Sequence, residues 1–126
     1  MTPPRILVVD DDGPILLLMR SLLREYGFEP ILASSGEDAL IAARENLPSL
    51  VLLDRNMPGM PGDQVVRSMR AEEALAMIPI LILSGEPIDR DELRAMGADG
   101  AILKPFDISR LLDQIRAHTG DHVSTS

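Results

Sequence analysis

The sequence predicts an α/β protein of three layers, in which a parallel five-stranded sheet lies between helices. Two observations support this fold class. Short apolar runs without polar alternation recur along the chain, as expected for strands that are buried on both faces of a parallel sheet. Amphipathic stretches of helical length separate these runs, so that strands and helices alternate. Right-handed crossovers then distribute the helices over both faces.

The first half of the chain contains three expected strands and two helices. In chain order these are a strand at residues 6–9, a helix at 14–26, a strand at 28–33, a helix at 38–45 and a strand at 50–53. Asp12 is the expected N-cap of the first helix, Pro14 is tolerated in its first turn, and Gly27 stops it. Residues 34–37 resemble a capping box that opens the second helix.

The second half repeats this alternation. Its expected elements are a loop at residues 55–62, a helix at 63–77 that frays near residue 74, a strand at 79–83, a helix at 88–96, a strand at 101–103 and a helix at 108–118. Two prolines and two glycines favour the loop. Pro79 stands at the first position of a strand, where a missing donor is tolerated, and Gly97 stops the fourth helix. Residues 1–120 are predicted to form one domain, followed by a flexible tail at 121–126.

Composition narrows the class of protein further. A chain of 126 residues with 45% apolar and 25% charged residues fits one globular domain. A net charge of −8 argues against nucleic acid as a direct partner, because phosphate contacts need clustered basic residues. Cysteine is absent, no apolar run approaches the length of a membrane span, and residues 1–5 do not open a signal peptide. We expect a cytoplasmic protein without a membrane partner.

Polar side chains follow four of the expected strands. They are Asp10, Asp11 and Asp12 after the first strand, Asp54 after the third, Ser84 after the fourth, and Lys104, the only lysine, after the fifth. Because the carboxyl ends of parallel strands share one edge of the sheet, these groups should meet there, where open α/β sheets bind ligands. The sequence therefore predicts a site at this edge.

The chemistry of these groups points to phosphoryl transfer. Two carboxylates about 4 Å apart repel each other by roughly 4 kcal/mol at an effective dielectric near 20. The cluster therefore needs a cation, or one carboxyl group stays protonated. Oxygen ligands without sulfur or histidine favour Mg²⁺, with Mn²⁺ as a substitute. A remaining aspartate can act as a nucleophile that forms an acyl phosphate, while Lys104 and Ser84 contact the phosphoryl oxygens.

Four motifs, in this order and at these separations, resemble the response-regulator receiver domain of two-component signal transduction (the CheY-like superfamily). They are Val8-Val9-Asp10-Asp11, Leu53-Asp54-Arg55-Asn56-Met57-Pro58-Gly59, Leu83-Ser84-Gly85, and Gly97-Ala98-Asp99-Gly100 leading to Lys104-Pro105-Phe106. The resemblance extends from residue 5 to about residue 117. It implies a flavodoxin-like, doubly wound sheet in the order 2-1-3-4-5 with five helices.

The resemblance also implies roles for the acidic cluster. Asp54 would accept a phosphoryl group from the phosphohistidine of a sensor histidine kinase or of a histidine phosphotransfer protein. Asp11 would bind Mg²⁺ directly, and Asp10 would assist. Asp54 and the backbone carbonyl of Asn56 would complete the protein ligands.

Further implications concern the other strand ends and the output. Ser84 and Lys104 would hold the phosphoryl oxygens, Gly85 would offer its backbone N–H, and the Lys104–Pro105 bond would be cis. The domain would signal through contacts with a downstream protein that the sequence does not identify. It would label itself rather than turn over a substrate, so it is not expected to be an enzyme.

Three positions bear on the details of signalling. Many receivers carry an aromatic residue where this chain has Ala101, so we expect a muted or differently routed switch. Asn56 and Glu86 occupy positions that border the path of attacking water in this family. Both are polar, which predicts a short-lived phosphorylated state.

Two other function classes remain open at this point. A haloacid-dehalogenase-like phosphatase also uses an Asp-x-Asp motif with Mg²⁺ and a lysine, and residues 10–13 fit it superficially. Pro14, the short chain and the lack of a role for Asp54 argue against it, and turnover of a soluble phosphate ester would identify it. An unphosphorylated pseudo-receiver is the second alternative, although such modules typically lack an acidic residue or the lysine.

Overall fold

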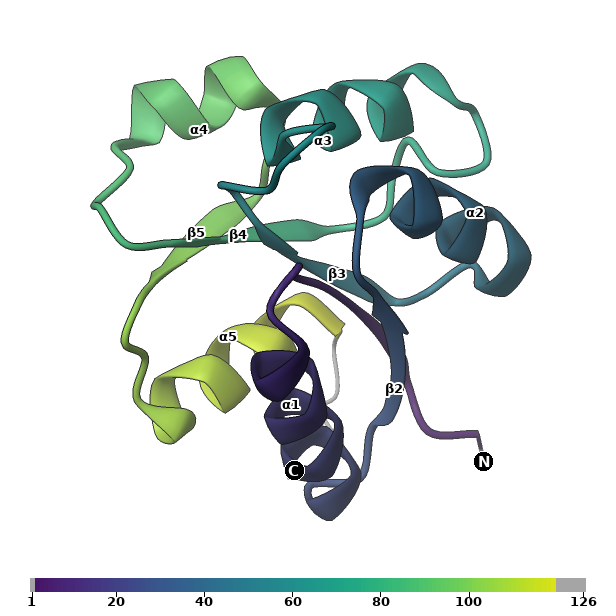
Figure 1. Ribbon diagram of the computed structural model, residues 1–126, viewed down its shortest axis with the longest axis vertical. Coiled ribbons are helices and arrows are strands. Elements are labelled where there is room, and N and C mark those ends of the chain that lie inside the picture. The colour runs from purple at the N-terminus through teal and green to yellow at the C-terminus, as the bar shows by residue number, and fades with distance from the viewer. Residues whose placement is uncertain (1, 120–126) are drawn as a thin grey trace.

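The computed structural model describes residues 2–119 and contains the expected sheet between two layers of helices (Figure 1). The strands are β1 (Arg5–Val9), β2 (Glu29–Ala33), β3 (Leu50–Asp54), β4 (Ile80–Ser84) and β5 (Gly100–Leu103). The helices are α1 (Gly13–Glu25), α2 (Gly36–Asn46), α3 (Gly62–Ala71), α4 (Arg90–Met96) and α5 (Ile108–Thr119). The tail expected at 121–126 lies outside the described residues.

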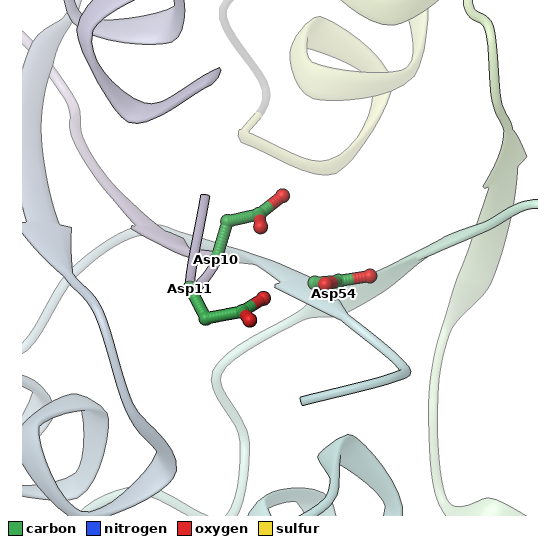
Figure 2. A group of neighbouring side chains, drawn as sticks. All are labelled: Asp10, Asp11 and Asp54. Atoms are coloured by element: carbon green, nitrogen blue, oxygen red, sulfur yellow. The ribbon is translucent and has the colours of Figure 1, made fainter. Parts of the chain in front are cut away.

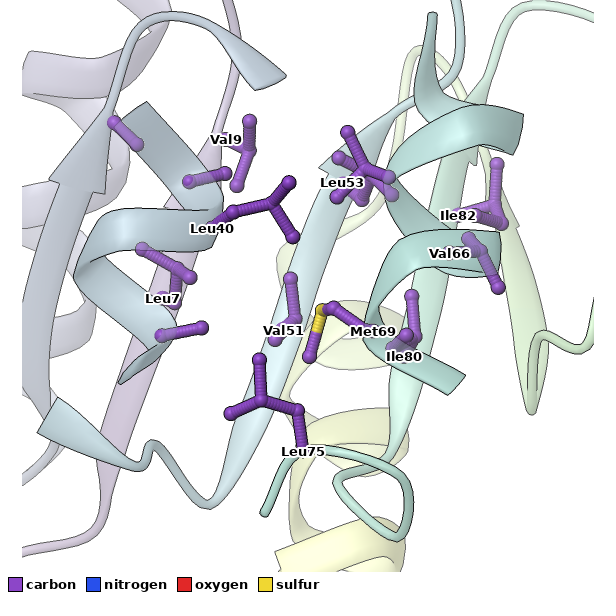
Figure 3. Packing of buried hydrophobic residues seen from close by; sticks show 14 of the residues in the cluster. Leu7, Val9, Leu40, Val51, Leu53, Val66, Met69, Leu75, Ile80 and Ile82 are labelled. Atoms are coloured by element: carbon purple, nitrogen blue, oxygen red, sulfur yellow. The ribbon is translucent and has the colours of Figure 1, made fainter. Parts of the chain in front are cut away.

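All strand pairs are parallel and follow the order β2-β1-β3-β4-β5, as predicted. Helices α1 and α5 cover one face of the sheet, and α2, α3 and α4 cover the other (Figure 1). Successive residues of a strand point to opposite faces. Leu7 and Val9 therefore join the core under α2 and α3 (Figure 3), whereas Ile6 and Val8 join the core under α1 and α5. Burial on both faces explains why the strand sequences lack polar alternation.

Side-chain caps fix where the helices begin. The backbone N–H of Ile15 donates to the Asp12 carboxylate at 3.3 Å, which confirms Asp12 as the cap of α1. Ser35 caps α2, so this helix begins at Gly36, two residues earlier than predicted. Asp89 caps α4, which therefore begins two residues later than predicted. Gly97 ends α4 in the left-handed conformation, with a φ of 87°, as expected of a C-terminal glycine.

The prediction that the third helix extends to residue 77 is wrong. Helix α3 ends at Ala71, because Glu72 adopts an extended backbone with φ −98° and ψ 125°. The chain then turns, which places Leu75 in the core, where it is fully buried. Burial of a leucine side chain contributes about 2 kcal/mol, more than a few exposed helical residues contribute by propensity.

The side chain of Arg70 binds the turn that follows α3. Its guanidinium donates to the backbone oxygens of Ala76 at 2.9 Å, Ile78 at 2.8 Å and Gly97 at 2.8 Å. It also pairs with Asp99 at 2.8 Å. These bonds satisfy carbonyls that have no helical partner, and they join the end of α3 to the segment between α4 and β5.

Replacing Arg70 tests how much these bonds contribute to stability. We expect Arg70→Met to lower the free energy of unfolding by about 2 kcal/mol, because partly buried carbonyls lose a charged donor. Arg67→Met is the matched control, since Arg67 is exposed on the same helix and should change stability by less than about 0.5 kcal/mol. Urea unfolding followed by circular dichroism measures both. An equal loss of stability in the two variants would contradict a stabilising role of the Arg70 bonds.

Candidate functional site

Three carboxylates meet where β1 and β3 end. Val9 pairs with Leu53 in the sheet, so the residues that follow them lie at the same edge. Asp10, Asp11 and Asp54 each offer one oxygen within 4.8 Å of the others. Figure 2 shows the carboxylates of Asp10 and Asp11 extending toward the end of β3. Asp10 is 1% exposed and Asp54 is 6% exposed, whereas Asp11 is open to solvent. The fold thus concentrates negative charge at a largely dry edge.

Asp10 is the most buried of the three carboxylates. Its Oδ1 accepts a hydrogen bond from the backbone N–H of Asp12 at 3.0 Å. Its Oδ2 is buried and has no hydrogen-bond partner among residues 2–119. Burial raises the pKa of Asp10, and the nearby charge of Asp54 raises it further, against the opposing effect of the Asp12 N–H and of Lys104. A buried carboxylate oxygen that accepts no hydrogen bond has room in its coordination for a cation.

Lys104 is the cation that the described residues place beside these acids. Its Nζ donates to Asp54 Oδ1 at 3.1 Å and lies 3.6 Å from Asp10 Oδ2. Burial alone would lower the pKa of Lys104, but the hydrogen bond to Asp54 and the charges of both acids raise it above its usual value. The Lys104–Pro105 bond is cis, as the resemblance implied. Lys104 is therefore held charged and aimed at the carboxylates.

Ser84 ends β4 and is nearly buried. Its hydroxyl donates to the backbone oxygen of Glu86 at 2.7 Å and accepts from the Glu86 N–H at 3.1 Å. While the bond to the Glu86 oxygen persists, the hydroxyl proton of Ser84 is not free to donate to another acceptor. Gly85 and Asn56 lie exposed in the loops that follow β4 and β3. The role of the Asn56 carbonyl as a ligand stays a prediction.

Ala101 borders a small pocket beside the serine. The pocket has a volume of about 170 Å³ and is lined by Ala101, Ser84, Glu86, Pro87, Ile88, Ile102 and Leu103. Its position shows where a larger side chain at residue 101 would find room. The expectation of a differently routed switch stays a prediction.

The donor set fits a divalent cation. The three carboxylates supply hard oxygen ligands, which Mg²⁺ prefers, and one buried oxygen accepts no hydrogen bond from the described residues. A +2 charge would also relieve the mutual repulsion that Lys104 alone offsets incompletely.

The sequence reasoning missed the role of Arg55, which it placed only in a loop. The Arg55 guanidinium lies 2.7 Å from Glu92 on α4 and 3.4 Å from Asp63 on α3. Arg55 and Glu92 are 37 positions apart, so no local spacing could have paired them.

Comparisons with known proteins agree with this geometry. The family model of the response regulator receiver domain matches residues 6–116. The transcriptional regulatory protein PrrA of Mycobacterium tuberculosis is 38% identical over 119 residues, covering 93% of this chain and 50% of that protein. The DNA-binding response regulator MtrA of the same species is 40% identical over 115 residues, covering 90% and 49%. The chain thus spans about half the length of the curated relatives it matches.

Solved structures give the same result. Chemotaxis protein CheY4 of Vibrio cholerae superposes with a TM-score of 0.87 at 30% identity, covering 92% of this chain and 98% of that one. The receiver domain of the sensor histidine kinase PA1611 from Pseudomonas aeruginosa, with a magnesium ion coordinated in its active site cleft, superposes with a TM-score of 0.84 at 25% identity, covering 94% and 98%.

None of the helices within residues 2–119 is long and apolar enough to cross a membrane.

The pKa of Asp10 generates a prediction about stability. A raised pKa means that the folded protein binds this proton more tightly than the unfolded chain does. The stability that this proton supplies is complete below the pKa that Asp10 has in the unfolded chain. It is lost as the pH rises through the higher pKa that Asp10 has in the folded protein. In EDTA at neutral pH, Asp10→Asn should therefore be more stable than the wild type by about 1 kcal/mol. The difference should shrink as the pH falls toward about 4.

Urea unfolding at both pH values, with and without magnesium, measures this effect. Added magnesium should stabilise the wild type and stabilise Asp10→Asn much less, because ligand binding to the folded state adds to its stability. Equal stabilisation of both proteins by magnesium would contradict a metal site that includes Asp10.

Proposed function

The chain belongs to the response regulator receiver domain family, and on that premise we propose that Asp54 is its phosphoacceptor. Receiver domains act in two-component signalling, either alone or within a longer protein. The observation that supports Asp54 is its contact with Lys104. The nearly buried carboxylate ends the central strand β3, 3.1 Å from the Lys104 ammonium. The haloacid-dehalogenase and pseudo-receiver alternatives are not favoured.

The proposed reaction is an in-line phosphoryl transfer. A carboxylate oxygen of Asp54 forms a bond to phosphorus while the P–N bond of the donor phosphohistidine breaks. The imidazole leaves with the electron pair of that bond. Lys104 shifts from the Asp54 oxygen to a phosphoryl oxygen, Ser84 exchanges its bond to Glu86 for another, and the Gly85 N–H assists. Such transfers depend mainly on positioning and charge neutralisation, which these groups supply.

We propose Mg²⁺ as the cofactor. Asp11 would bind it directly and Asp10 would assist, with Asp54 and the Asn56 carbonyl completing the protein ligands. When bound, the ion neutralises the charge that develops on the phosphoryl oxygens. Two observations support this set: one oxygen of each carboxylate lies within 4.8 Å of the others, and a buried oxygen of Asp10 accepts no hydrogen bond from the described residues.

The proposed donor is the phosphohistidine of a sensor histidine kinase or of a histidine phosphotransfer protein. The output would be contacts with a downstream protein, and the domain would label itself rather than turn over a substrate. The DNA binding in the name of MtrA belongs to that longer regulator, and this chain matches about half of its length. The cytoplasmic location stays a prediction.

The acceptor role is tested by intact-mass spectrometry after incubation with acetyl phosphate and magnesium. The wild type should gain one phosphoryl group, and Asp54→Asn should gain none, because the variant lacks the carboxylate that would receive it. Asp12→Asn is the control, since Asp12 caps α1 and is exposed. A mass gain that survives in Asp54→Asn, or catalytic hydrolysis of a soluble phosphate ester, would contradict the proposal.

The lifetime of the phosphorylated state is a separate prediction. Asn56 and Glu86 are exposed and polar, so they leave a path for water. The double variant Asn56→Met/Glu86→Leu should retain its phosphoryl group several-fold longer than the wild type, because apolar side chains at both positions hinder the attacking water. The decay of the phosphorylated mass after removal of acetyl phosphate measures this. An unchanged decay rate would show the water-path interpretation to be wrong.

A further inference from the structure

Helix α4 is held to the rest of the domain by few buried contacts. No side chain of Arg90–Met96 is buried. Only Leu93 and Met96 pack, half-buried, against the core that α2 and α3 cover. A helix with so little buried apolar surface belongs to the low-stability part of a fold, and its position depends on whatever polar contacts restrain it.

Arg55 supplies such a restraint. Its guanidinium Nη2 donates to Glu92 Oε2 at 2.7 Å, in the first turn of α4, and its Nε lies 3.4 Å from Asp63 Oδ1, in the first turn of α3. The side chain of Arg55 is 27% exposed and that of Glu92 is 43% exposed. One arginine thus joins the first turns of both helices, directly after the proposed phosphoacceptor.

The backbone of Arg55 is fixed equally closely. Its N–H donates to the Leu83 oxygen at 3.1 Å, next to Ser84, and its own oxygen accepts from the Gly62 N–H at 3.1 Å. A Cβ at Gly62 would lie 2.7 Å from the backbone oxygen of Asp54, so α3 rests on this strand end without a gap. The backbone of Arg55 is therefore bonded both to the residue before Ser84 and to the first residue of α3, directly after Asp54.

We propose that the Arg55–Glu92 ion pair couples the position of α4 to the state of Asp54. This inference rests on the proposed phosphorylation of Asp54. The Asp54–Arg55 segment changes when the acceptor gains a phosphoryl group, Arg55 moves with it, and the first turn of α4 is released or repositioned through Glu92. Because coupling is reciprocal, a partner that captures α4 also changes the phosphorylation equilibrium.

Hydrogen exchange of the peptide that covers residues 89–97 tests the restraint in the unphosphorylated protein. Arg55→Met keeps the aliphatic stem and Glu92→Gln keeps the side-chain shape. Each should accelerate exchange in α4 by about three- to five-fold, the effect of an ion pair worth roughly 1 kcal/mol. The double variant should match Arg55→Met in α4, because Glu92 has already lost its arginine partner in that single variant. Glu72→Gln is the control, since it breaks the exposed Arg44–Glu72 pair elsewhere in the fold.

The second measurement repeats the exchange in excess acetyl phosphate and magnesium, with intact mass recorded on the same sample. Exchange in α4 should change on phosphorylation in the wild type and in Glu72→Gln. In Arg55→Met and Glu92→Gln, phosphorylation should still be seen by mass, but the change in α4 should be largely lost.

The outcomes separate the inference from the proposed function. If α4 responds to phosphorylation equally in all variants, or if Arg55→Met and Glu92→Gln leave its exchange unaltered, the coupling is overturned while Asp54 remains the acceptor. If no protein gains mass, the acceptor assignment fails, and the coupling fails with it.

Discussion

The central constraint in this molecule is the electrostatic balance at the carboxyl edge of its sheet. Asp10, Asp11 and Asp54 converge within 4.8 Å, and Lys104 is held 3.1 Å from Asp54 and 3.6 Å from Asp10. One ammonium cannot neutralise three carboxylates, two of which are buried. The edge is consequently short of positive charge, which is the physical basis of the proposed divalent ion and of the proposed phosphoryl site.

The buried apolar core of the fold offsets the repulsion among these carboxylates. Strands β1, β3 and β4 are buried on both faces, because a separate hydrophobic core packs against each face of the sheet. Apolar burial of this extent provides the stability that offsets repulsion at one edge. The acids lie at the last residue of β3 or directly after β1, so their repulsion is confined to one end of the hydrogen-bond ladder. Stability and function are thus spatially divided between the centre of the sheet and its edge.

The extent to which the sequence predicted the structure differs from element to element. The buried strands and most helix starts were predictable, because periodicity and caps such as Asp12 act over a few residues. The end of α3 was not predictable in this way. The segment after Ala71 has helical propensity, but the core takes up Leu75 and Arg70 binds carbonyls of the following turn. Long-range packing there outweighs local preference.

The sequence by itself determined the strand order through its family motifs, and it determined which acids, hydroxyl and lysine gather at one edge. Parallel strands place their ends together, so adjacency at this edge follows from strand ends alone. Only the tertiary structure decided which contacts these groups make. Ser84 is bonded to Glu86, Asp10 has one oxygen that accepts no hydrogen bond from the described residues, and Arg55 is bound to α4. Such contacts depend on side-chain directions and on segments distant in sequence, which no local pattern encodes.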